Sequence, residues 1–195
     1  MTRLTPFVAL LALASLMAAP SAQSADSLIK IDDPMASDAL VLFTKACIVT
    51  QAAPDKIAAK LVAFAAIKLP DKAATELAHG KPGSQGWKVQ SAHGAELLVS
   101  WVPPRLCSVL VRRAQARALQ NGVVQILEQL SQGGEMHFHL EHHNEQPTQG
   151  GAEETSEYLI QAIRDRDELV SVTSSASKTA DIQGLLTFKV LGAGN

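Results

Sequence analysis

Four histidines and a glutamate gather in the segment MHFHLEHHN, residues 136–144. The alternation of polar and apolar residues at its start predicts a β-strand, whose successive side chains point to opposite faces. Continued alternation would put four polar residues on one face: His137, His139, Glu141 and His143. Imidazole suits zinc, copper or nickel, and a carboxylate can complete the ligand shell. We therefore predict a divalent transition-metal site, for zinc or copper, with His137 and His139 as the first pair of ligands.

Two other interpretations of these histidines remain open. A half-buried antiparallel strand needs a polar outward face, and histidine is acceptable there. The same residues would also make a pH-responsive surface, because histidine titrates near neutral pH. Elsewhere no phosphate-binding loop, zinc-finger spacing, dinucleotide fingerprint or catalytic triad motif is present. Ser108 lacks the glycine-rich elbow of a nucleophilic serine, so no catalytic residue is predicted.

The N-terminus has the pattern of a secretory signal peptide over residues 1–25. Arg3 is the only charge before Asp26, an apolar run from Phe7 to Ala19 follows, and small residues come after Pro20. We expect cleavage between Ala22 and Ala25. The alternative is a membrane anchor, but the run is shorter than the roughly 20 residues that span a bilayer. No later segment is long and apolar enough to span one.

Cys47 and Cys107 are the only cysteines, so they are the only pair that can form an intramolecular disulfide. Export to an oxidising compartment favours that bond. The alternative is two separate buried thiols. The formal net charge of −2, which becomes −3 when Arg3 is removed, is not gathered into blocks, and only 4% of residues are aromatic. Nothing therefore indicates a nucleic-acid partner.

The first secondary-structure elements that the mature sequence predicts are helices. Capping residues and apolar spacing predict a first helix from Pro34 to about Thr50, capped by Ser37 or Asp38, and a second from Pro54 to just before Pro70. A short helix follows to His79, and a longer one covers Ala114–Leu130.

Apolar and alternating runs predict the strands Trp87–Gln90, Ala95–Val102, Leu106–Val111, Glu135–His143, Thr155–Ile163, Glu168–Ser175 and Ile182–Val190. Short links between successive strands indicate an antiparallel meander. The predicted fold class is α+β, with an antiparallel sheet of about six to seven strands and three helices packed on one face. Residues 26–33 would be a lead-in, 34–132 a helical and sheet core domain, and 133–195 a strand extension of the same sheet.

Part of this pattern resembles a group of small secreted proteobacterial α+β domains of unknown function. The resemblance covers about residues 37–130 and depends on a helix with Phe43 and Cys47, on Gly86-Trp87 and on Cys107-Ser108-Val109. It implies a periplasmic domain with a Cys47–Cys107 bridge. It carries over no catalytic residue and does not reach the histidines.

These observations favour a periplasmic binding or envelope accessory protein without catalysis, whose partner is an envelope protein or a small ligand. One alternative is a periplasmic transition-metal binding protein that uses the strand His137–His143. The other is an exported hydrolase whose site is too dispersed to recognise.

Overall fold

A computed structural model describes residues 31–132, 134, 136–148, 151–162, 166–177 and 179–192. The predicted signal peptide lies outside these residues. The described helices are α1 (Pro34–Phe43), α2 (Pro54–Val62), α3 (Asp71–Leu77) and α4 (Ala116–Ser131), and a π-helical turn, Thr44–Ile48, continues α1. The strands are β1 (Ile67–Lys68), β2 (Gln85–Gln90), β3 (Glu96–Val102), β4 (Leu106–Arg112), β5 (Met136–Thr148), β6 (Gly151–Ala162), β7 (Asp167–Ser175) and β8 (Gly184–Val190).

All eight described strands belong to one antiparallel sheet in the order β1-β2-β3-β4-β8-β7-β6-β5. This confirms the α+β class, although the sheet has more strands than the six to seven predicted. The expected meander is broken at one point: β4 pairs with β8, not with β5. The last strand of the chain therefore lies in the middle of the sheet, and β5, with the histidines, forms its far edge.

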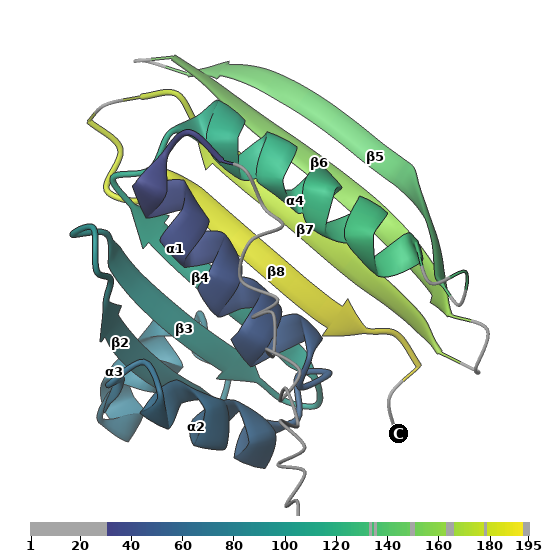
Figure 1. The fold of residues 1–195 in the computed structure, drawn as a ribbon. Helices are drawn as coiled ribbons and strands as arrows, with labels where there is room; N and C mark the ends of the chain where they lie inside the picture. Colours follow the sequence, from purple (N-terminus) through teal and green to yellow (C-terminus); the bar gives the residue numbers. More distant parts are fainter. Residues whose placement is uncertain are drawn as a thin grey trace, which may run out of the picture.

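Two helices, α1 and α4, cross the same face of the sheet side by side (Figure 1). Their apolar stripes meet alternate residues of the central strands, because side chains on a strand alternate between faces. The fully buried residues of this layer include Leu40, Phe43, Leu119, Val109, Val172, Leu186 and Phe188. This interface is the hydrophobic core of the molecule.

The three helices predicted to share one face were the two long early helices and Ala114–Leu130. The short helix α3 was not among them, and it lies on the other face beside β2. Gly86 of β2 marks the contact: a Cβ there would lie 3.4 Å from Cα and Cβ of Ala74 in α3. Gly86 pairs with Ser100, whereas the neighbouring Trp87 faces the core. The glycine therefore allows α3 to pack closely against the sheet.

The second helix is shorter than predicted. It ends at Val62, and Ala65 adopts a left-handed backbone conformation with φ of 49°. Ile67–Lys68, which were expected inside the helix, instead pair with β2. The residues just before a proline avoid helical backbone angles, which agrees with an extended segment before Pro70.

The predicted disulfide is confirmed, with Cys47 and Cys107 bonded and their Cα atoms 5.4 Å apart. Cys47 lies in the π-helical turn after α1, and Cys107 lies on the core face of β4. Both cysteines are fully buried. The bond therefore fixes the end of the first helix against the centre of the sheet.

Candidate functional site

The face of the sheet turned away from α1 and α4 is called the open face here. Strand pairing aligns one polar residue from each of six strands across it: Ser100, Ser108, Thr187, Ser171, Glu157 and His142. Beside this polar row on the same face, β3, β4 and β8 align three leucines, Leu98, Leu110 and Leu185, which are all only partly buried. This half of the open face therefore combines a hydroxyl stripe with aliphatic side chains that remain in contact with solvent.

A groove of about 580 Å³ lies where α3 borders the open face. Its floor is formed by β3, β4 and β8, its wall by the end of α3 and the following turn, and Ile182 closes one side. The aliphatic lining residues are Leu77, Ala78, Val102, Leu106, Leu110, Ile182 and Leu185. Concave, mostly apolar surfaces of this volume are typical of small-ligand sites.

Hydroxyl groups form the polar part of the floor. The Oγ of Ser108 lies 3.1 Å from the Oγ1 of Thr187 across the β4–β8 pair. The Oγ of Ser100, on the next strand, is buried and has no hydrogen-bond partner. Each hydroxyl can donate and accept, so the floor can satisfy a polar group of a ligand as well as an apolar chain.

The charged side chains of the groove lie on its wall. His79, Lys81 and Glu76 line it from α3 and the following turn. Glu76 has a cation nearby, since Lys72 Nζ is 4.0 Å from its Oε1. On the floor side, the exposed Lys189 pairs in register with Leu106. The balance of charge around the groove is therefore positive, which favours an anionic group over a cationic one.

The histidines of β5 do not share one face as predicted. The register shifts by one residue between Leu140 and His142, so Glu141 is the extra residue of a β-bulge. His137 and His139 stay together on the open face, opposite Gln161 and Leu159. His143 moves to the other face, where it is opposite Ser156.

His139 and His143 each have their own polar neighbour. His139 Nε2 lies 3.1 Å from Glu141 Oε2, and the two side chains are 50% and 56% exposed. His143 Nδ1 lies 3.1 Å from Ser156 Oγ and 4.0 Å from Glu154 Oε1. Among the described residues, no group of three or more histidine, cysteine, aspartate or glutamate side chains is arranged to hold a metal ion. A metal site within one chain stays a prediction, and only His137 and His139 keep the geometry on which it was based.

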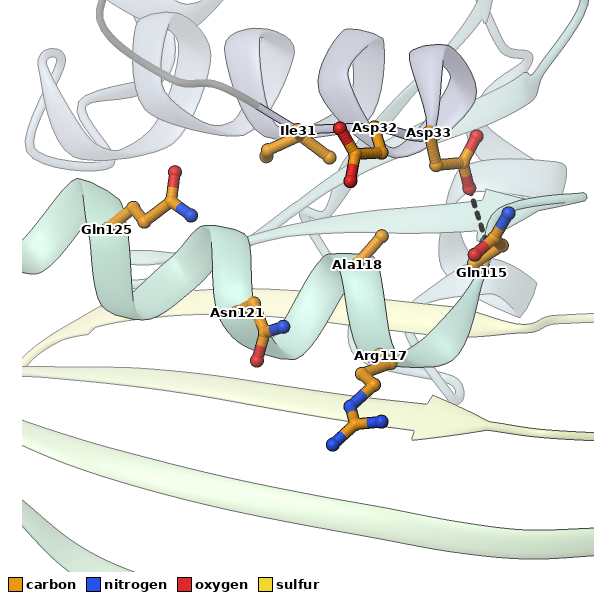
Figure 2. Close-up of a pocket in the computed structure, with 8 residues that line it drawn as sticks. All are labelled: Ile31, Asp32, Asp33, Gln115, Arg117, Ala118, Asn121 and Gln125. Carbon is orange, nitrogen blue, oxygen red and sulfur yellow. Dashed lines mark hydrogen bonds between the residues drawn. The ribbon is translucent and has the colours of Figure 1, made fainter.

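A polar cleft of about 240 Å³ lies between residues 31–33 and α4 (Figure 2). At its end, Asp33 accepts hydrogen bonds from the backbone N–H groups of Met35, 3.0 Å, and Gln115, 2.6 Å. Figure 2 shows Arg117 and Asn121 pointing away from Asp32 and Asp33. Since its charged groups do not converge, the cleft is better explained by the two hydrogen bonds of Asp33, which cap α1 and hold the start of α4, than by ligand binding.

Sequence reasoning missed the groove. The alternation of leucine with serine in Leu98-Val99-Ser100 and Leu106-Cys107-Ser108 was its only signal. The sequence predicts no role for Ser108, whose hydroxyl lies against the hydroxyl of Thr187 on β8. The pairing of β4 with β8, which completes the floor, is a long-range contact that local patterns do not specify.

No family model matches the chain, and neither a curated protein nor a solved structure matches it. None of the described helices combines the length and the apolar character needed to cross a membrane.

Proposed function

We propose that this protein is an exported binding or accessory protein of the cell envelope that acts without catalysis, and that it holds an amphipathic small ligand in the groove of the open face. The observation that carries the proposal is the groove itself, about 580 Å³ in volume and lined mainly by aliphatic side chains. The buried Cys47–Cys107 disulfide supports export, because such bonds persist in oxidising compartments.

The shape of the groove favours a small ligand over a flat protein surface. It is bounded by α3 on one side and by the strands below, and small-ligand sites are typically concave, whereas a protein interface needs a broader surface. Leu106, Leu110 and Leu185 are already partly buried, so covering them would remove their remaining apolar area from water. That transfer contributes roughly 25 cal/mol per Å².

The charges around the groove indicate that the polar end of the ligand is anionic. Lys81 on the wall and Lys189 beside the floor offer ammonium groups to an anionic head group, while an apolar chain lies along the leucines. The proposed ligand class is therefore an anionic amphiphile, such as a molecule with one carboxylate and one acyl chain.

The test uses the anionic fluorophore 1-anilinonaphthalene-8-sulfonate as the probe, with dodecanoate as the competitor. We expect saturable binding that Ile182→Asp weakens at least about tenfold, because the substitution places a charge in the apolar lining. Ile182 is 40% exposed, so this change should leave the fold intact. The matched control is Val62→Asp, at a 78% exposed position on α2 outside the groove.

The head-group assignment has a separate test. Dodecanoate should displace the fluorophore better than dodecyltrimethylammonium, and Lys81→Glu should reverse that order because it changes the sign of a wall charge. Equal competition by the two detergents would contradict the anionic assignment. Equal fluorophore binding by the Ile182→Asp protein and the unsubstituted protein would contradict the groove as the site.

The hydrolase alternative would need a base beside a nucleophile on the same floor. Ser108 is the serine best placed in the groove, but its hydroxyl lies against the hydroxyl of Thr187, which is not a general base at neutral pH. Turnover in a screen of ester, peptide and glycan substrates, abolished by Ser108→Ala, would favour hydrolysis over binding.

A further inference from the structure

The strand β5 is a long free edge of the sheet. The described strand order ends at β5, which runs for 13 residues, whereas the opposite edge is the two-residue β1. An edge strand presents unpaired N–H and C=O groups that can pair with another strand. Any extension of this sheet is therefore favoured at β5.

The two halves of this edge differ in how well they are protected. The second half has the bulge at Glu141, a further acid at Glu145, and Pro147, which are features that discourage strand addition. The first half, Met136–Leu140, has no acid, lysine, proline or bulge. Leu140 is also 53% exposed, which is unusual for a large apolar side chain on a strand.

We propose that Met136–Leu140 pairs antiparallel with the same segment of a second copy of this chain, and that the histidines of both copies hold one divalent transition-metal ion. The segment is self-complementary about Phe138. Antiparallel pairing with Phe138 on the two-fold axis sets Met136 opposite Leu140 of the second copy on one face. On the open face it sets His137 opposite His139 of the second copy.

This pairing supplies what one chain lacks. Residues directly opposite on antiparallel strands have Cβ atoms about 4.5–5.5 Å apart. The two-fold axis would therefore gather four imidazoles on one face, two from each copy, which suits the four-coordinate shell of zinc. Within Met136–Leu140 one chain offers only His137 and His139, in agreement with the absence of a three-ligand group among its described residues. Glu141, 3.1 Å from His139, is placed to orient that ring.

The experiment measures the molar mass of the purified protein by light scattering during size-exclusion chromatography, with zinc chloride or with EDTA. We expect the mass of one chain in EDTA and a doubled mass in zinc, with about one ion bound per two chains by calorimetry. His139→Ala should abolish both the doubled mass and the zinc binding.

The matched control is His143→Ala, since that residue lies beyond the bulge on the opposite face and should keep the zinc-dependent dimer. Leu140→Lys provides a second variant that keeps both histidines but adds an ammonium group to the pairing edge, and it should prevent the doubled mass. A mass that does not change with zinc, or a dimer that survives His139→Ala, would overturn the proposal. These residues lie outside the groove, so the result is independent of the fluorophore test.

Discussion

Asp33 is a single short side chain that caps α1 and also binds the N-cap residue of α4. One carboxylate oxygen accepts from the N–H of Met35 in α1, and the other accepts from the N–H of Gln115 at the start of α4. The residue is 3% exposed, so both bonds are protected from water. The helix begins at Pro34 as predicted, but its cap is Asp33, and the predicted caps Ser37 and Asp38 lie inside the helix.

We predict that Asp33→Ala lowers the free energy of unfolding by about 2 kcal/mol, since a lost cap costs roughly 0.5–2 kcal/mol and the lost hydrogen bond to Gln115 about 1 kcal/mol more. Asp33→Asn should cost less, because its amide oxygen can still accept one bond. Urea denaturation followed by circular dichroism measures both. The control is Asp32→Ala at the exposed neighbouring position, and an equal loss of stability in that variant would contradict the role of Asp33.

Glu168 is the clearest case of an acid in an unfavourable environment. It lies on the core face of β7, is 8% exposed, and is paired with Ile160 and Val190 on the flanking strands. Burial raises the pKa of the Glu168 carboxyl above its ordinary value, because the charged form loses its hydration.

The raised pKa sets the sign of a pH effect. Between the ordinary pKa of the unfolded chain and the raised pKa of the fold, the native state binds more protons, so the contribution of Glu168 to stability falls as pH rises through this window. We therefore predict that Glu168→Gln raises the melting temperature more at pH 7 than at pH 4. Calorimetry at both values checks this, with the exposed Glu145→Gln as control. An equal gain at both pH values would exclude ionisation as the cause.

At the scale of elements, Gly122 of α4 leaves room for the side chain of Leu40 in α1. A Cβ at this position would collide with Leu40 of α1 and with Ile31 in the segment before it. From the sequence, Gly122 is only a weak point of a predicted helix. Its role depends on contacts with residues that are distant along the chain, so local patterns do not indicate it.

We predict that Gly122→Ala destabilises the protein by about 1–3 kcal/mol through overpacking. This outweighs the gain of roughly 1 kcal/mol that alanine brings to a helix. The control is Asn121→Ala, on the exposed side of the same helix, which should be neutral or slightly stabilising. The two variants are compared by their denaturant midpoints. A more stable Gly122→Ala protein would contradict the prediction, because it would show that the Leu40 and Ile31 side chains move aside at little cost.

At the scale of the whole molecule, the chain is built as two similar halves. Each half has a helix on the core face, α1 or α4, and four antiparallel strands in chain order, β1 to β4 and then β5 to β8. The first half also contains α2 before β1 and α3 before β2. The halves meet where β4 pairs with β8, and α1 lies against α4 over this junction (Figure 1). Because the halves share one core and one sheet, we expect them to unfold together in a single transition.

Removal of the disulfide tests whether the two halves unfold cooperatively, because both of its cysteines lie in the first half. Replacing both by alanine opens a loop of 60 residues and should cost about 4 kcal/mol. Trp87 and Trp101 report on the first half by fluorescence, whereas far-ultraviolet circular dichroism reports on all strands. We expect both signals to shift together to lower urea. A second, unshifted circular dichroism transition would show that the halves unfold separately.

The sequence alone was sufficient for the class of fold, the positions of most strands, the Cys47–Cys107 pair and the common face of His137 and His139. These features follow from local periodicity, from turn residues and from the presence of only two cysteines. Tertiary structure decided the insertion of β8 beside β4, the placing of α3 on the open face and the bulge that turns His143 away. These depend on which distant strands pair and on how closely backbones approach. Those contacts gain their free energy only when the chain is folded, so neighbouring residues do not encode them.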